Sequence, residues 1–247
     1  MTWSIIARDA SGAFGVAVAS KFFAVGAMCP HARSHIGALA TQALLNPLFV
    51  DPAFAGMAAG QPPSEIISVL VAADEGRAHR QLHMIDKANR SAAYTGAACI
   101  DWCGHTAGDG FSVAGNMLAG PQVVVATADF YSEHAHLDFA ERLMLALAAG
   151  EAAGGDKRGK QAAALRIHTL EDYCTLDLRV DDHDEPITEL KRLYAKSLER
   201  YQPFTACLPT KARPAGLIDR QLIEAEVTRF HAARDAARDS ALKKADL

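Results

Sequence analysis

The chain has 247 residues, of which 50% are hydrophobic and 22% are charged, a length and balance typical of one large domain or a domain with an appended segment. This composition excludes disorder over most of the chain. The net charge of −4 argues against a broad basic surface for nucleic acid. No apolar run reaches the ~20 residues of a membrane helix, no signal peptide is evident, and five cysteines suggest no disulfide framework. We therefore expect a cytoplasmic protein without membrane contact.

Strand patterns dominate the first 45 residues. Residues 2–8 and 13–20 are apolar segments joined by an Asp-Ala-Ser-Gly turn, which predicts a β-hairpin. Residues 22–28 and 36–45 continue in small and β-branched residues and are expected to be further strands. None of these segments alternates cleanly between polar and apolar residues, which favours a sheet covered on both faces.

Helices and strands then follow in groups. The predicted elements are helices at 48–59 and 63–74, strands at 80–86, 91–97 and 111–118, helices at 121–131 and 137–149, strands at 161–168 and 176–181, and a helix at 186–200. Gly150 is expected to terminate the helix before it, and 98–110 is expected to be a connection. Hairpins without regular βαβ alternation predict an α+β fold with antiparallel sheets. Helices covering two such sheets would make a four-layer αββα sandwich.

The C-terminal part differs from the rest. Residues 202–216 contain three prolines, and 217–245 form a long, charged helical pattern with an apolar stripe. We predict a domain at 1–200 and a linker with a helical arm at 201–247. The stripe requires a partner, either its own domain or a second copy, and we favour a homodimer.

Thr2 is the most suggestive residue for catalysis. A methionine before a small residue is normally excised, which would leave Thr2 as the terminal residue. A terminal threonine supplies a hydroxyl nucleophile and its own α-amine, with an ordinary pKa of about 8, as general base. Any cytosolic chain can also begin Met-Thr, so the surroundings of Thr2 decide between the two interpretations.

The hairpin supplies candidate neighbours for Thr2. Ser4 lies two residues on, hence on the same strand face, and we assign it to substrate binding. Lys21 ends the returning strand, where an ammonium group would lower the α-amine pKa and stabilise developing negative charge. A solvated lysine at a strand end is the alternative. Asn116 follows a glycine at the end of another strand, where it is either an oxyanion donor or a simple turn residue.

Further polar residues are candidates for substrate binding. Thr41 and Gln42 interrupt an apolar strand and serve either a pocket or a structural hydrogen bond. Asp156 and Arg158 lie in a glycine-rich turn that would grip a substrate carboxylate, unless they are solvated loop charges. Asp182 and its neighbours at 181–183 fit the start of the following helix better than a carboxylate–imidazole site.

Metal ligation has weak support. Cys99, Cys103 and His105 lack a recognised paired spacing and a fourth ligand, and His134 and His136 fall between two helices. No phosphate-binding or dinucleotide-binding glycine motif occurs. We predict no metal and no cofactor.

Several segments together resemble a bacterial family called domain of unknown function 1028. The segments are T-W-S-I-I-A-R-D at the start, F-G-V-A-V-A-S-K and A-V-G-A after it, G-A-L-A-T-Q-A at 37–43, R-Q-L at 80–82, Y-T-G at 94–96, G-N-M-L-A-G at 115–120, G-G-D-K-R-G-K-Q at 154–161 and L-R-V-D-D-H at 178–183. The resemblance covers roughly residues 2–200. It implies the N-terminal nucleophile (Ntn) hydrolase fold, which is the αββα sandwich, and a hydrolase activity without a named substrate.

The resemblance and the hairpin geometry lead to one preferred function. We predict an amidohydrolase that cleaves a C–N bond in a small molecule or peptide-like substrate through a covalent ester on Thr2. The alternative from another class is a non-catalytic small-molecule-binding or assembly protein on the same fold. A metal-dependent hydrolase using the Cys/His residues is a third hypothesis.

Overall fold

The computed structural model describes residues 2–245 and divides into two compact units at Lys191–Arg192. Met1, whose removal we predict from the sequence, lies outside the described residues. The division falls inside helix α5 (Pro186–Ser197), whereas the sequence pattern suggested residue 200. Among the described residues, no helix is both long and apolar enough to cross a bilayer.

The first unit contains two antiparallel sheets. The six-stranded sheet has the spatial order β10 (Leu176–Val180), β9 (Ala162–His168), β2 (Phe14–Ser20), β1 (Thr2–Arg8), β8 (Phe111–Leu118) and β7 (Trp102–Gly108). The four-stranded sheet has the order β3 (Pro30–Arg33), β4 (Gly37–Ala43), β5 (Arg80–Asp86) and β6 (Ser91–Thr95). Sequence neighbours pair as hairpins, and β1 lies in the interior of its sheet. The predicted α+β class with antiparallel sheets is therefore confirmed.

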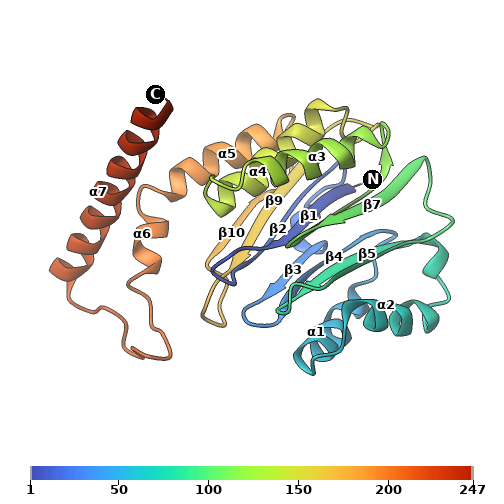
Figure 1. Cartoon of the computed structure of the whole chain (residues 1–247), viewed down its shortest axis with the longest axis horizontal. Coiled ribbons are helices and arrows are strands. Elements are labelled where there is room, and N and C mark those ends of the chain that lie inside the picture. The colour runs from blue at the N-terminus through green and yellow to red at the C-terminus, as the bar shows by residue number, and fades with distance from the viewer. Residues whose placement is uncertain (1, 246–247) are drawn as a thin grey trace. The chain divides into compact units, whose positions relative to one another are not determined.

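Helices cover the outer faces of the two sheets (Figure 1). α3 (Gln122–Glu133) and α4 (Phe139–Ala152) pack on the six-stranded sheet, while α1 (Val50–Ala58) and α2 (Pro63–Ala72) pack on the four-stranded sheet. The inner faces of the sheets meet, with β1 against β4 and β5. Strands buried on both faces explain why the sequence shows long apolar runs rather than alternation.

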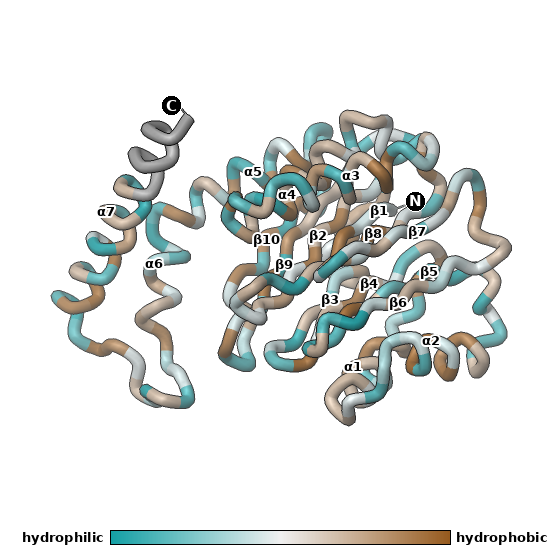
Figure 2. The backbone as a smooth tube through the Cα atoms, in the orientation of Figure 1, coloured by the Kyte–Doolittle hydropathy of each residue, from teal (hydrophilic) through white to brown (hydrophobic). Residues whose placement is uncertain are grey.

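Apolar clusters hold these layers together. One lies between the sheets and includes Ile6, Val16, Val18, Ala40 and Ile85; another lies between the four-stranded sheet and its helices and includes Leu39, Phe54, Met57, Leu82 and Met84. In Figure 2 the strands carry hydrophobic residues and the hairpin connections are largely hydrophilic. Successive residues of β4 and β5 thus serve two different cores.

Four sequence expectations need correction. Residues 22–28 are not a strand, because a 3₁₀ turn at Val25–Ala27 follows Ala24 with its φ of 52°. The short edge strand β3 was missed, and β7 occupies what was expected to be a connection. Gly150 does not end its helix, which continues to Ala152. A Cβ at Gly150 would overlap Thr127 Oγ1 and lie 2.8 Å from Trp3 Nε1, so this glycine permits close packing of α4 instead.

The second unit contains α6 (Tyr201–Thr205) and the long helix α7 (Arg220–Ala245), as the charged pattern predicted. Arg200 and Glu224 form an ion pair at 2.7 Å, and His231 Nε2 lies 3.1 Å from the Glu199 carbonyl. Leu217 N–H donates to the Cys207 carbonyl at 2.8 Å. These contacts close α7 against the preceding segment within the unit.

Candidate functional site

The space between the sheets is polar at one end. Inward-facing residues of β1, β2, β4, β5 and β8 are hydrophobic through most of the sandwich and become hydroxyl, amide or imidazole groups near the start of β1. These residues are Thr2, Ser4, Ser20, Gln42, Gln81, His83, Ser112 and Asn116, all nearly or fully buried. Buried polar groups require hydrogen-bond partners, and here they find them in one another.

Thr2 lies at the edge of this polar region. Its register partners are Asn116 on β8 and, by continuation of the Trp3–Ala19 pairing, Ser20 on β2. Thr2 Oγ1 is 3.1 Å from Ser20 Oγ, and the residue is 6% exposed. The hydroxyl is therefore oriented by a neighbouring strand rather than free at a chain end.

Lys21 follows the last residue of β2, and its described hydrogen bonds are made with the glycine-rich segment at 154–161. Lys21 N–H donates to Asp156 Oδ2 at 2.7 Å, and its ammonium donates to the Lys160 carbonyl at 3.0 Å. These contacts are not with Thr2, and the expected convergence of Lys21 with Thr2 stays a prediction.

Asn116 connects Thr2 to the amide network. Its Nδ2 donates to Gln81 Oε1 at 3.0 Å and to the Thr2 carbonyl oxygen at 3.4 Å. Gln81 Nε2 in turn donates to the Gly115 carbonyl at 2.8 Å. Because Asn116 Nδ2 bonds to the Thr2 carbonyl and to Gln81, its geometry is that of a residue that positions the Thr2 backbone.

Ser4 is enclosed in a hydroxyl–imidazole chain. Its Oγ donates to Gln42 Oε1 at 2.7 Å and lies 2.9 Å from His83 Nε2, while His83 Nδ1 lies 3.1 Å from Ser112 Oγ. Complete burial lowers the pKa of His83 to about 3, so its ring is neutral near pH 7. Ser4 is inaccessible to solvent, which places it behind the site rather than in contact with a substrate.

The two polar residues of β4 have different roles. Gln42 faces inward, lines a pocket with Thr2 and donates through Nε2 to Gln81 Oε1 at 2.7 Å. Thr41 faces the other way, and its Oγ1 accepts from Asn46 N–H at 3.1 Å. Because alternate strand residues point to opposite faces, adjacency in sequence separates these two side chains. For Thr41 this contact with Asn46 is the structural hydrogen bond that was the alternative to a role in the pocket.

The glycine-rich turn is organised by Asp156. This carboxylate accepts from Lys21 N–H and from Arg158 N–H at 2.9 Å, and it pairs with the Arg158 guanidinium at 3.3 Å. Asp156 is buried, whereas Arg158 is exposed and lines a pocket beside Asn116. Asp156 borders a different pocket, of about 130 Å³, together with Ser20.

Two adjoining pockets border Thr2. One has a volume of about 270 Å³ and includes Thr2, Gln42 and Cys29; the other, of about 330 Å³, includes Asn116, Ile100 and Arg158. Phe22, Ala43 and Leu44 line both pockets. The volumes lie at the lower end of the range for small-molecule sites, and the walls combine apolar surface with a few polar groups.

Unusual backbone conformations occur at these pockets. Ala43 and Met117 both have positive φ, 65° and 53°, and both line a pocket. Such conformations are uncommon for residues other than glycine and often mark functional positions. The strain is consistent with a shaped ligand site next to Thr2.

The hairpin pattern places residues 20 and 21 opposite Thr2, but the sequence reasoning gave Ser20 no role and missed Gln81, His83 and Cys29. Gln81 and His83 join the region through contact between the sheets. Burial raises the pKa of the Cys29 thiol well above its ordinary value, so it is not a thiolate. Among the described residues, no cluster of three or more His, Cys, Asp or Glu side chains could hold a metal ion.

Comparison with known proteins identifies the family. A family model described as "Family of unknown function (DUF1028)" matches residues 2–190. The crystal structure of a Silicibacter pomeroyi protein described with that family model is similar, with a TM-score of 0.81 and 29% identity over 88% of this chain and 99% of that chain. Anbu, described as an ancestral beta-subunit, from Yersinia bercovieri gives a TM-score of 0.38 and 9% identity over 79% and 94% of the two chains. The search of curated proteins gave no match. The match over most of the sequence shows that the chain belongs to the DUF1028 family.

Proposed function

We propose that the protein is an Ntn-type amide-bond hydrolase whose nucleophile is the Thr2 hydroxyl. In this proposal, removal of Met1 frees the α-amine of Thr2 to act as general base. The observation that carries the proposal is the position of Thr2, which lines a pocket while its hydroxyl lies 3.1 Å from Ser20 Oγ. The helix–sheet–sheet–helix order of the first unit and the start of β1 at Thr2 support this fold type (Figure 1). That the first unit has the four-layer αββα fold of Ntn hydrolases is part of the same proposal.

The proposed reaction has two balanced stages. The Thr2 α-amine accepts the hydroxyl proton as Oγ1 bonds to the substrate carbonyl carbon, and the C–N bond breaks as that proton passes to the leaving amine. An ester on Thr2 remains. Water then attacks the ester carbonyl, gives a proton to the amine, and the C–O bond breaks with return of a proton to Oγ1. Amine and carboxylic acid are the products.

The surrounding residues suggest a substrate class. Phe22 and Leu44 provide exposed apolar surface shared by the two pockets, and Arg158 provides a guanidinium in the second pocket. A guanidinium recognises a carboxylate well. We therefore propose a small amide with an apolar body and a carboxylate, such as an acylated amino acid. In this scheme Ser20 and Asn116 are positioning residues.

The test combines mass measurement with an active-site electrophile. Natively produced protein should lack Met1 by intact mass, and a β-lactone probe should form one covalent adduct that peptide mapping places on Thr2. Thr2→Ser should retain labelling, and Thr2→Ala should abolish it. Ser4→Ala is the matched control, since it removes a buried hydroxyl from the same strand face and leaves the nucleophile.

Two results would contradict the mechanism. Retention of Met1 would block the α-amine as an amide and remove the general base. Equal labelling of the Thr2→Ala variant would show that the nucleophile lies elsewhere. Thermal unfolding of each variant separates loss of reactivity from loss of folding.

A second candidate function is small-molecule binding without turnover. The observation favouring it is that the Lys21 ammonium donates to the Lys160 carbonyl, while the hydroxyl of Thr2 meets the neutral hydroxyl of Ser20. Under this hypothesis an acylated amino acid binds in the Thr2 pocket and remains intact. Calorimetric binding with unchanged ligand, together with retained Met1, would favour it over the hydrolase.

A further inference from the structure

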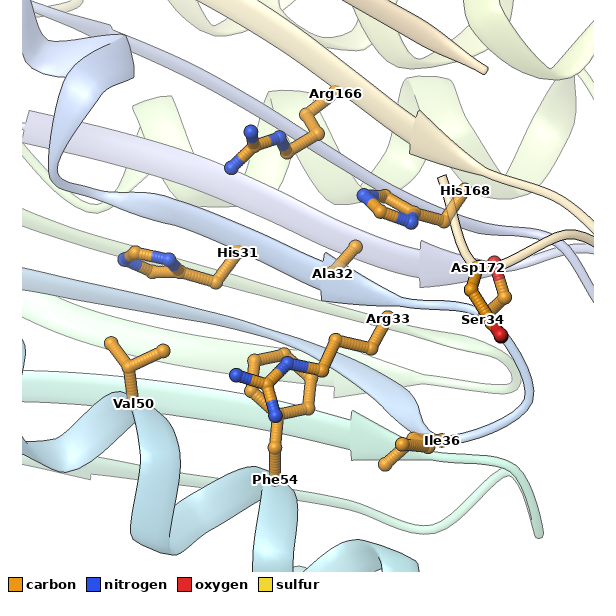
Figure 3. A pocket seen from close by; sticks show the side chains of 10 residues that line it. All are labelled: His31, Ala32, Arg33, Ser34, Ile36, Val50, Phe54, Arg166, His168 and Asp172. Carbon is orange, nitrogen blue, oxygen red and sulfur yellow. The ribbon is translucent and has the colours of Figure 1, made fainter. Parts of the chain in front are cut away.

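A separate pocket lies toward the opposite end of the strands from Thr2. β9 begins at Ala162, which pairs with Ser20, and ends at His168, which pairs with Phe14. Six residues along a strand span about 20 Å. At the His168 end a pocket of about 470 Å³ is bordered by β3, α1 and β9 (Figure 3). The Thr2 chemistry does not involve this pocket.

β9 brings polar groups into the inter-sheet space at this end. Ala162 and Ala164 belong to the apolar cluster between the sheets, and Arg166 and His168 continue the same strand face. Small apolar side chains are thus replaced by a guanidinium and an imidazole where the pocket begins. His168 is 8% exposed and lines the pocket.

Two buried nitrogen atoms here have no hydrogen-bond partner among the described residues. They are Arg166 Nε and His168 Nδ1. The remaining Arg166 nitrogens are used, since Nη2 pairs with Asp177 at 2.9 Å and Nη1 donates to the Pro30 carbonyl at 3.4 Å. A guanidinium N–H can only donate, and the neighbouring Cys174 thiol is a weak acceptor, so Nε is suited to a stronger, anionic one.

The imidazole is suited to share that acceptor. Burial, together with the Arg166 charge, lowers the pKa of His168 to about 4, so the ring is neutral near pH 7 and carries one N–H. An anionic oxygen near Nδ1 selects the tautomer that places the proton there. Arg166 and His168 can then donate to one anionic group.

The opposite wall combines the Arg33 guanidinium with apolar groups. The Arg33 guanidinium lies over the Phe54 ring at 4.5 Å from its centroid and pairs with Asp51 at 2.7 Å. Val50 extends the apolar surface along α1 (Figure 3). Asp172 lies near Ser34 in the same view, so an anion is accommodated at the Arg166–His168 side instead.

We propose that this pocket binds a small organic anion. One carboxylate or phosphate oxygen accepts hydrogen bonds from Arg166 Nε and His168 Nδ1, and the apolar body of the ligand packs against Val50 and Ile36. This site is independent of the proposed hydrolase reaction, because no step of that reaction uses these residues.

The test uses full-length protein and three probes of similar shape: benzoate, phenyl phosphate and benzamide. Benzoate or phenyl phosphate should produce saturable shifts of the His168 ring nitrogens in NMR titrations at millimolar concentrations, and neutral benzamide should not. The stronger of the two anions identifies the preferred group. Absence of anion binding, or equal shifts with benzamide, would overturn the proposal.

Variants then locate the interaction. Arg166→Gln should weaken anion binding about tenfold or more, as expected for loss of a charged hydrogen bond. Arg179→Gln is the matched control in the same sheet, since Arg179 pairs with Asp181 outside the pocket, and it should bind as wild type. Arg158→Gln removes the guanidinium beside Thr2 and should leave the anion-induced His168 shifts unchanged. Unchanged affinity in Arg166→Gln would refute the site; if that variant does not fold, the His168 shifts of the wild type decide.

Discussion

The hydroxyls of Thr2 and Ser20 face each other at 3.1 Å across the β1–β2 pair. This contact arises from the hairpin register, which directs both side chains into the inter-sheet space. It gives Thr2 a defined rotamer at the pocket edge. Ser20 is therefore the residue we expect to orient the nucleophile.

Replacing Ser20 tests that role. Ser20→Ala should lower the rate of Thr2 labelling by about tenfold, which corresponds to one hydrogen bond of about 1.4 kcal/mol. Ser20→Thr restores the hydroxyl and should recover much of the rate. Labelling rates measured against probe concentration separate orientation from probe binding. A rate in Ser20→Ala equal to wild type would exclude a positioning role.

Lys21 should matter less than its sequence position suggests. Its ammonium donates to the Lys160 carbonyl, and its backbone N–H, which a substitution retains, donates to Asp156. Lys21→Ala should therefore reduce Thr2 labelling by less than about tenfold, well short of the ~10² or more typical of a direct electrostatic stabiliser. A loss of that larger size would show that the lysine turns toward the substrate during reaction.

The buried His83 should make stability depend on pH. Its pKa is about 3 in the folded protein and 6.5 ordinarily, so between these values the unfolded chain binds a proton that the folded chain does not. The free energy of unfolding therefore falls as pH falls below 6.5, by about 2 kcal/mol at pH 5 from this group. His168, with a pKa lowered to about 4, acts in the same direction.

Urea unfolding of His83→Gln at pH 7 and pH 5 checks this expectation. The variant is expected to be less stable at pH 7, because the contacts with Ser4 and Ser112 change, yet to lose less stability on acidification than wild type. His136→Gln, at an exposed position, is the control for removing a histidine. An identical pH dependence in His83→Gln and wild type would rule out a buried neutral His83.

Gly150 should be intolerant of a side chain. In Gly150→Ala the new methyl group would meet Thr127 and Trp3 where α4 packs, and overpacking of this kind costs about 1–3 kcal/mol. Denaturant unfolding measures the loss. In a Thr127→Ala background, Gly150→Ala should lower the free energy of unfolding by a smaller amount. If the effects of the two substitutions on that free energy simply add, the proposed clash with Thr127 is wrong.

Much of the fold follows from local sequence signals, whereas β3 and β7 do not. The hairpin of β1 and β2 has an Asp/Gly turn between apolar runs, and both helix pairs show helical spacing. β3 has only four residues, and β7 carries three glycines or alanines and has no fully buried residue at its sheet edge, so neither has an apolar pattern of its own. Both form because a neighbouring strand offers an unpaired edge.

The site was predictable only where one hairpin determines it. Thr2 follows from its position, and the register of β1 predicts a polar neighbour on β2. Alternation along β4 decides between Gln42 and Thr41, and this alternation is hidden in strands that are buried on both faces. The end of β2 at Ser20, just before Lys21, is likewise not marked in the sequence. Gln81 and His83 enter through packing of one sheet on the other, which carries no local sequence signal.

The last prediction concerns the C-terminal arm and the expected homodimer. Ile218 is 83% exposed and Leu222 is 54% exposed in a unit that is otherwise held by its own ion pair and hydrogen bonds. The first unit ends at Lys191, and deleting 203–247 retains its buried apolar residues, Ile187 and Leu190 included, so that unit should stay folded. Light scattering after size exclusion should show a dimer for the full chain and a monomer for the truncated one. Ile218→Ser with Leu222→Ser keeps the helix length and should weaken the same assembly, and an unchanged mass in both would show that the arm plays no part in association.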